Sequence, residues 1–331
     1  MRKEKLPCDK TRRRVIKAEV KTNPNYGKKP EERRIEELLD NCLIFLDKPQ
    51  GPTSHQVDSW VKKILDVEKL GHAGTLDPNA TGVLPIGVGY ATKSLQALLP
   101  AGKEYVGVMS VHGEVDKKKV LEISKKFVGK IVQMPPVRSA VKRRKRERTV
   151  YYLDILEKKG RNVLFRVGCE SGTYVRALCT DIGKKLGVGA HLSELRRTRV
   201  GLIHEDETVF LQDLKDSMVF WKENNEEKML RSILQPVEKT VEHLPKIVVR
   251  DSAVDAICHG ADLAIPGVAE VDEEIEKGDE IAVMTLKGEV VALMNSLMKT
   301  KEIVEKDNGI CADVERVLMK KGTYPPIWKK S

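Results

Sequence analysis

The sequence predicts an α+β protein in which a larger domain, built on a mixed but largely antiparallel sheet, precedes a smaller β-rich domain. Short apolar runs typical of strands, such as residues 43–46 and 105–108, alternate with helical stretches such as residues 56–65 and 117–127. This mixture favours the α+β class. A change of pattern near Pro245 indicates the second domain, and 331 residues with 40% hydrophobic content are sufficient for two cores.

Residues 1–40 form a basic N-terminal extension. They are charged and poor in large apolar side chains until Ile35, Leu38 and Leu39 provide a short helical stripe. Such a segment becomes ordered only where it docks on the rest of the chain. We place the larger domain at residues 41–243.

A strand followed by an amphipathic helix is predicted between residues 163 and 187. Residues 163–167 alternate apolar with polar side chains, and residues 170–172 then turn the chain into a helix that begins near Thr173. Four apolar residues recur at helical spacing on one face: Val175, Leu178, Ile182 and Leu186. Gly187 suits the position just after a helix end. Arg176 lies off the apolar face and is free to face a site.

The smaller domain, residues 244–321, is predicted to be a compact β unit followed by a tail at residues 322–331. Residues 246–250 form an expected strand. The capping-box pattern from Ser252 to Asp255 predicts a helix that Gly260 ends. Residues 281–286 and 289–293 are expected to pair as a hairpin around Lys287 and Gly288.

The chain is basic, with a formal net charge of +10 and a pI near 9.1. Its cations are clustered, and clusters match a phosphate backbone better than dispersed charge does. The clusters are residues 12–14, residues 142–146, and the group Arg196, Arg197 and Arg199. For residues 12–14 alone, a merely solubilising face explains the charge equally well. A membrane surface is a poorer partner because no basic amphipathic helix accompanies the clusters.

No motif predicts a metal or a small-molecule cofactor. The six cysteines are scattered without a Cys-x-x-Cys pair, which is typical of reduced packing thiols. Cys258 and His259 are adjacent, but one such pair cannot form a structural zinc site. Gly82 and Gly87 have the spacing of a phosphate-binding loop, but the Gly-Lys-Ser/Thr sequence that must follow is absent.

The expected location is cytoplasmic. No apolar run approaches the roughly 20 residues that span a bilayer. The N-terminus is basic and polar, without the apolar segment of a signal peptide.

One carboxylate, that of Asp77, lies in a loop rich in glycine. Pro78 disfavours the α region for Asp77, so this residue should be extended. Close approach of the backbone to a ligand is permitted at three flanking positions, Gly71, Gly74 and Gly82. Taken singly, these residues are ordinary turn formers. Their combination in residues 71–84 favours a carboxylate that a shaped loop presents to a ligand.

The order of motifs in the larger domain resembles that of the pseudouridine synthases related to bacterial tRNA pseudouridine synthase B and to dyskerin. The matching segments are residues 46–49, 51–55, 71–84, 103–105, 135–140, 172–176 and 195–199. Several motifs in one order are more specific than any one of them. The resemblance implies a pseudouridine synthase catalytic domain at residues 41–243. It also implies that the smaller domain is a PUA domain, a small β-barrel RNA-binding module.

The resemblance further implies that the protein isomerises uridine to pseudouridine in RNA without a cofactor. Asp77 would be the catalytic aspartate, acting either as a nucleophile or as a base toward the ribose. Arg176 would pair with Asp77 and keep it ionised. Tyr105 would be a further catalytic residue that stacks on the uracil and helps to remove its C5 proton, a demanding role for a group with an ordinary pKa of about 10.

Five further residues would bind the substrate. His72 would help to extrude the target nucleotide, since a base in folded RNA must be flipped out before its sugar can be reached. Tyr174 and Leu195 match positions that line the pocket of the family. The basic side chains of Lys103 and Lys142 would contact the RNA, with an affinity that falls as salt rises.

Departures from the bacterial pattern favour the dyskerin branch. After Tyr105 the chain lacks the longer insertion with which bacterial enzymes grip the tRNA arm, and residues 112–115 resemble dyskerin proteins. That branch acts on rRNA with an H/ACA guide RNA and small ribonucleoprotein partners, and archaeal members also modify the pseudouridine loop of the tRNA T arm. The absence of long lysine-rich tails favours an archaeal-type protein. The alternative is a non-catalytic RNA-binding scaffold of an RNA-processing particle.

Overall fold

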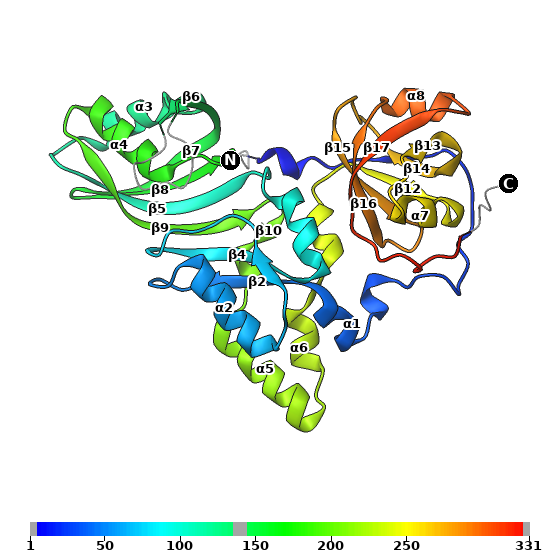
Figure 1. Ribbon diagram of the computed structural model, residues 1–331. Helices are drawn as coiled ribbons and strands as arrows, with labels where there is room; N and C mark the ends of the chain where they lie inside the picture. The colour runs from blue at the N-terminus through cyan, green and yellow to red at the C-terminus, as the bar shows by residue number, and fades with distance from the viewer. Residues whose placement is uncertain (1–4, 135–143, 327–331) are drawn as a thin grey trace.

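The computed structural model describes residues 5–134 and 144–326, which form two β-sheets flanked by helices (Figure 1). The larger sheet has the strand order β11-β2-β4-β9-β5-β8-β7-β6, and β3 and β10 pair with β4 and β9. Its strands are β2 (Asn41–Lys48), β3 (Leu70–His72), β4 (Ala80–Gly89), β5 (Lys103–Val111), β6 (Gly129–Gln133), β7 (Arg146–Lys159), β8 (Asn162–Cys169), β9 (Ala190–Val200), β10 (Ile203–His204) and β11 (Gln235–Pro236). The pairing is antiparallel except between β4 and β9, so the expected mixed sheet is confirmed.

Two groups of helices cover different parts of this sheet (Figure 1). The helices are α1 (Ile35–Asp40), α2 (Ser54–Leu65), α3 (Lys117–Lys125), α4 (Val175–Leu186), α5 (Leu211–Asn224) and α6 (Lys228–Ile233). α3 and α4 share a core with β5, β7 and β8 that includes Val120, Phe165 and Leu178. α2, α5 and α6 share a second core with β2 and β4 that includes Val57 and Ile86. In the described part of the chain, none of the helices has the length and apolar character needed to cross a membrane.

The predicted helix of residues 173–186 is confirmed as α4. Tyr174 is its N-cap, and Gly187 follows it in the left-handed region with φ +84°. All four residues of the predicted apolar face are buried. Arg176 is exposed, as its place off that face predicts.

The smaller sheet is open within the described residues and has the order β1-β14-β12-β15-β16-β17-β13. Its strands are β1 (Arg14–Ile16), β12 (Lys246–Val249), β13 (Leu263–Ala264), β14 (Val268–Asp272), β15 (Glu280–Thr285), β16 (Val290–Ser296) and β17 (Ile310–Val317), with helices α7 (Asp251–Cys258) and α8 (Thr300–Glu305). The β15–β16 hairpin is confirmed, with Gly288 at φ +83°.

The capping box predicted from Ser252 to Asp255 is wrong. α7 begins two residues earlier than this pattern predicts, at Asp251, and its N-cap is Arg250, whose backbone is extended. The Arg250 amide donates to the Gly267 carbonyl, which fixes that extended conformation. The N-cap is thus a residue held by a long-range bond, and Ser252 lies inside the helix.

The N-terminal extension docks on the smaller sheet. β1 pairs antiparallel with the edge of β14, with Arg14 opposite Asp272. The Arg14 guanidinium donates to Asp272 Oδ1 at 3.0 Å and to Glu270 Oε2 at 3.1 Å. The first strand of the chain therefore joins the C-terminal sheet, where Asp272 lies 258 positions from Arg14 in the sequence.

Gly82 of β4 lies directly against the backbone of Arg197 in β9. Its φ is +99°, and a Cβ there would lie 2.2 Å from the Arg197 carbonyl oxygen. Because this neighbour is backbone, Gly82→Ala should lower the free energy of unfolding by about 3 kcal/mol or more. Chemical denaturation would measure this loss. Gly71→Ala is the matched control, since its Cβ would meet no atom within 4 Å. Equal stability of the two variants would contradict the prediction.

A hydrophobic cluster joins the two sheets. It contains residues of the larger sheet, such as Phe45, together with Val241, Val248 and Leu293 from the segment that follows. The two sheets are therefore packed through a common core.

His243 lies at this junction and should make stability depend on pH. Burial lowers the pKa of its imidazole to about 4; a backbone hydrogen bond with Ala97 opposes the shift, and Lys246 and Arg12 add to it. Between pH 6.5 and 4 the unfolded chain binds a proton that the folded chain does not, so stability falls as the pH falls through this window. The loss should amount to about 2–3 kcal/mol. Denaturation at pH 7 and pH 4.5 should show a smaller loss for His243→Gln, whereas equal losses would refute this role.

Candidate active site

Asp77 stands at the turn between β3 and β4. The Ala80 amide donates to the Asp77 carbonyl at 3.0 Å, which closes a turn over Pro78 and Asn79. Its side chain is 62% exposed. The carboxylate therefore faces solvent, where a ligand can reach it.

Two buried side chains, those of Lys48 and Ser54, form hydrogen bonds with the backbone on both sides of Asp77. Lys48 Nζ donates to the carbonyls of Pro78 at 3.2 Å and Ala80 at 2.9 Å. The Ser54 hydroxyl accepts from the Leu76 amide at 3.0 Å and lies 3.2 Å from the Leu76 carbonyl. Both residues on either side of Asp77 are thus fixed, so the carboxylate is presented by a rigid support.

Arg197 is a third support and is almost completely buried. Its guanidinium donates to the Val83 carbonyl at 2.8 Å and to the Gly74 carbonyl at 2.9 Å. Arg197 also lies opposite Tyr105 in the pairing of β9 with β5. One residue of β9 therefore connects the Asp77 loop to Tyr105 on β5.

Arg176 forms an ion pair with Asp77 through its Nη2 atom and Asp77 Oδ2. It extends from the first turn of α4, and Val175 and Leu178 anchor that turn in the core. Gln133 fixes the start of the helix by accepting from the Tyr174 amide at 3.0 Å and donating to its carbonyl at 3.2 Å. The guanidinium of Arg176 on α4 and the carboxylate of Asp77 between β3 and β4 thus come from separate elements and meet at the surface.

Tyr105 is half-buried on β5. Burial raises the pKa of its hydroxyl, and the neighbouring Arg197 lowers it only in part. At neutral pH the hydroxyl therefore keeps its proton. This state suits a stacking surface or a hydrogen-bond donor, not an unassisted base.

His72 lies at the end of β3, three residues before Thr75. Its Nδ1 is 2.6 Å from Asp58 Oδ2 on α2, and its Nε2 is 3.2 Å from Thr75 Oγ1. The ring is thereby held on both sides, five residues before Asp77. His55 of the same helix lies against it, with ring centroids 5.1 Å apart.

Family models match nearly the whole chain. The TruB family pseudouridylate synthase N-terminal domain matches residues 62–175, and the tRNA pseudouridylate synthase B C-terminal domain matches residues 176–242. A PUA domain matches residues 245–318 and a DKCLD domain residues 3–58. The "probable tRNA pseudouridine synthase B" of Methanopyrus kandleri is 56% identical over 98% of this chain and 96% of its own length. The protein of that name from Pyrococcus furiosus is 55% identical over the same shares.

The chain belongs to the TruB family of pseudouridylate synthases. It is therefore an isomerase that makes pseudouridine. Its fold matches a crystal structure of a Cbf5–Nop10–Gar1 complex with a TM-score of 0.94 and 54% identity, over 97% of this chain and 98% of that one. It also matches a structure of an H/ACA RNP bound to a substrate RNA containing 2′-deoxyuridine with a TM-score of 0.92 and 51% identity, over 98% and 99% of the two chains.

Several residues expected to bind substrate lie around the Asp77–Arg176 pair of this TruB-family synthase. Leu195 of β9 pairs with Ala80, three residues after Asp77. Tyr174 immediately precedes the first turn of α4. Lys142 lies outside the described residues.

Lys103 is bound to the protein itself. Its ammonium is buried and donates to the carbonyls of Leu98 at 3.1 Å, Leu99 at 2.7 Å and Ala101 at 2.7 Å. Burial and the charge of Arg197 lower its pKa to about 7. We infer that Lys103 supports the turn before β5.

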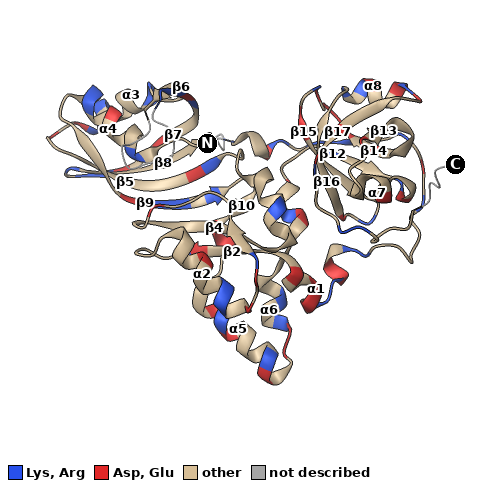
Figure 2. Ribbon diagram, viewed as in Figure 1, with Lys and Arg blue, Asp and Glu red and all other residues tan. Residues whose placement is uncertain are grey.

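The interpretation of Arg196, Arg197 and Arg199 as a phosphate-facing cluster is wrong. Figure 2 shows that Lys and Arg lie among Asp and Glu on the ribbon. Arg196 pairs with Asp47 at 2.7 Å and Glu205 at 2.5 Å. Arg199 pairs with Asp9, and Arg197 is buried. These cations therefore pair with carboxylates and carbonyls of the protein itself.

Sequence reasoning missed the supporting residues Lys48, Ser54 and Arg197. All three stand within the motif segments that carry the family resemblance, which was the available signal. Asp58 had no such signal, since its contact with His72 bridges 14 residues.

Proposed function

We propose that this protein isomerises uridine to pseudouridine both in the pseudouridine loop of the tRNA T arm and, with an H/ACA guide RNA, in rRNA. The observation that carries the proposal is the Asp77–Arg176 pair on a rigid loop, in a chain with the fold of H/ACA ribonucleoprotein catalytic subunits. The expected partners are the guide RNA and small proteins such as the Nop10 and Gar1 of those complexes. We place the protein in the cytoplasm.

The reaction breaks the bond between uracil N1 and ribose C1′ and forms a bond between C5 and C1′. The C5 proton is lost to solvent and N1 gains a proton, so no atom is gained or lost overall. We propose that Asp77 starts this exchange, either by attacking as a nucleophile or by removing a ribose proton. One carboxylate is enough when water is not a reactant, unlike the two that glycoside hydrolysis requires.

The other residues then orient the two reacting parts. Arg176 would hold the Asp77 carboxylate ionised and aimed at the sugar. Tyr105, with its hydroxyl protonated, would stack on the detached uracil while it turns. His72, Tyr174 and Leu195 would hold the flipped nucleotide.

The domains would divide the work of RNA binding. We propose that residues 41–243 are catalytic and that residues 244–321 are an RNA-binding PUA domain followed by a tail at 322–331. The extension of residues 1–40 would stabilise the PUA sheet through β1.

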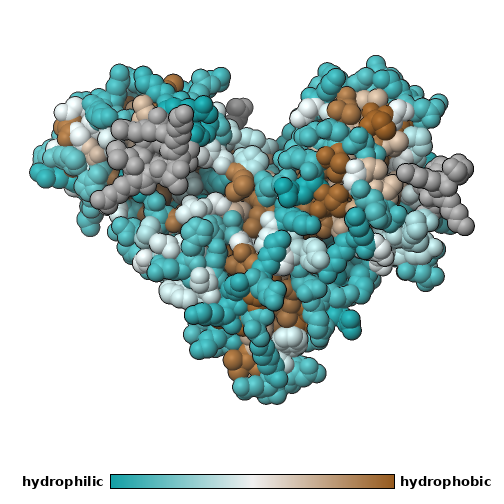
Figure 3. Space-filling model, viewed as in Figure 1, coloured by the Kyte–Doolittle hydropathy of each residue, from teal (hydrophilic) through white to brown (hydrophobic). Residues whose placement is uncertain are grey.

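Large apolar side chains stay exposed on α2 and α5, namely Trp60, Val219 and Phe220. Hydrophobic residues, coloured brown, are visible over the lower helices in Figure 3. Such a surface suits a protein partner.

Release of tritium from uracil C5 tests this function. The purified protein would be incubated with an unmodified tRNA transcript, and separately with an H/ACA guide RNA, its target RNA and the small partner proteins. We expect release in both reactions, at the pseudouridine-loop uridine in the first and at the guide-specified uridine in the second. No release in either would refute the proposal and favour an RNA-binding scaffold.

A further inference from the structure

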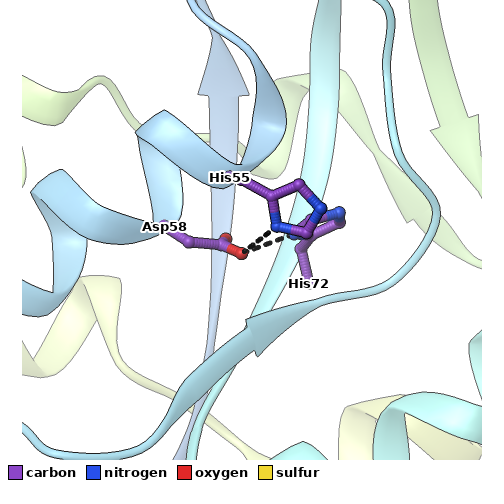
Figure 4. Close-up of side chains that lie close together, drawn as sticks. All are labelled: His55, Asp58 and His72. Atoms are coloured by element: carbon purple, nitrogen blue, oxygen red, sulfur yellow. Dashed lines mark hydrogen bonds and ion pairs between the residues drawn. The ribbon is translucent and has the colours of Figure 1, made fainter.

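Three metal-capable side chains lie together beside the Asp77 loop: His55, Asp58 and His72 (Figure 4). His55 and Asp58 are three residues apart on α2, a spacing that puts them on one helix face, and His72 meets them from β3. Asp58 Oδ2 lies 2.6 Å from His72 Nδ1 and 4.0 Å from His55 Nδ1. Among the residues that the structure describes, this is the one such group of three.

The spacing of the three donor atoms fits one metal ion. Zinc bonds of about 2.0–2.1 Å in tetrahedral geometry separate neighbouring ligand atoms by roughly 3.3 Å. The two observed separations from Asp58 Oδ2 lie on either side of this value, and all three donor atoms are within 4.8 Å of one another. A small rotation of the exposed His55 ring and a slight opening of the Asp58–His72 contact would therefore complete the site.

The surroundings of the donors also suit a metal. A histidine ligand commonly donates its second ring N–H to a neighbouring oxygen, and His72 Nε2 has Thr75 Oγ1 at 3.2 Å. The carboxylate oxygen Asp58 Oδ1 is buried without a hydrogen-bond partner. The side chains of His72 and Asp58 are only 7% and 16% exposed, whereas that of His55 is 84% exposed. Two donors are thus held in place, and the third leaves an open side for the ion and for water.

We propose that His55, Asp58 and His72 bind one divalent transition-metal ion of the Zn²⁺ class, with water completing the coordination. Two imidazoles and one carboxylate favour Zn²⁺ and Co²⁺ over Mg²⁺, which prefers oxygen ligands. On binding, the proton on His72 Nδ1 moves by way of solvent to Nε2, where Thr75 Oγ1 can accept it, and the metal takes its place at Nδ1. The bound ion ties α2 to β3 and fixes the position of His72.

Titration of the metal-free full chain with Zn²⁺ in a calorimeter tests the site, and Co²⁺ absorption spectra identify the ligands. We expect one ion per chain, and a Co²⁺ spectrum typical of nitrogen and oxygen ligands without thiolate bands. The buried cysteines are not available as ligands. His55→Gln and Asp58→Asn should each weaken binding by about tenfold or more.

The matched control is His191→Gln. His191 and His112 form another histidine pair, 2.9 Å apart between ring nitrogens, but no described carboxylate completes a group of three with them. Zn²⁺ binding should be unchanged in this variant. Thermal unfolding of each variant would verify the fold, and the exposed His55 can be replaced without disturbing the core. If the affinity is the same in wild type, His55→Gln and Asp58→Asn, or falls only in His191→Gln, the proposal is wrong and Asp58 merely orients His72 by a hydrogen bond.

Discussion

Asp77→Asn will reduce pseudouridine formation by about 10⁴-fold or more, as expected when the group that forms or breaks the covalent bond is lost. Asparagine has the shape of aspartate but neither its charge nor its basicity, so it can neither attack the sugar nor remove a proton. It can keep the loop intact, because the supports from Lys48 and Ser54 bind the backbone around residue 77 and not its side chain. Single-turnover tritium release would measure the loss.

Binding of RNA separates a chemical role for Asp77 from a structural one. The Asp77→Asn protein should bind the substrate RNA within a few-fold of the wild-type affinity, measured by filter binding at fixed salt. Asp116→Asn is the matched control, because Asp116 is an exposed aspartate that precedes α3 and has no part in the site. Full activity of Asp77→Asn would eliminate the catalytic assignment, and equal losses in both aspartate variants would point to a general effect of charge.

Arg176→Ala should have the second-largest effect, a loss of about 10²–10³ in kcat. The Asp77 carboxylate is exposed, and Arg176 is the cation that the structure pairs with it. Without the guanidinium, the carboxylate can rotate toward solvent, so fewer complexes have it aimed at the sugar. The loss should appear mainly in kcat and much less in KM, because the pair aligns the reacting group.

Arg176→Lys and Lys185→Ala give this prediction its controls. Lysine keeps the charge but lacks the planar fork that grips a carboxylate, so it should restore only part of the activity. Lys185 is an exposed cation in the last turn of the same helix, and its removal should leave activity unchanged. An Arg176→Ala enzyme with normal kcat and raised KM would show that Arg176 binds RNA and does not align Asp77.

The local features of the site were predictable from the sequence. The glycines and Pro78 around Asp77 specify a turn, and the 3.6-residue period of α4 puts Val175 in the core and leaves Arg176 exposed. Neighbouring residues decide these features, so a linear pattern contains them. The motif order then supplied the family and the pairing of Asp77 with Arg176, two residues that are 99 positions apart.

The supports of the site were not predictable in the same way. A cluster of arginines on β9 has the same composition whether it faces RNA or the interior, and only the sheet register shows that Arg197 bonds to the Gly74 carbonyl. The start of α7 is a second example, because its N-cap is Arg250, which bonds to the distant Gly267, and not Ser252. The contact of Asp58 with His72 likewise arises only where α2 packs beside β3.

The sequence by itself determined the fold class, the exposed loop of Asp77, the basic character of the chain and its family. Tertiary structure alone decided which cations form ion pairs and hydrogen bonds within the protein. It also decided that β1 joins the distant C-terminal sheet and that His55, Asp58 and His72 lie together. The physical reason is that turns and helical faces depend on residues a few positions apart, whereas ion pairs and buried hydrogen bonds depend on which segments the packed core brings into contact.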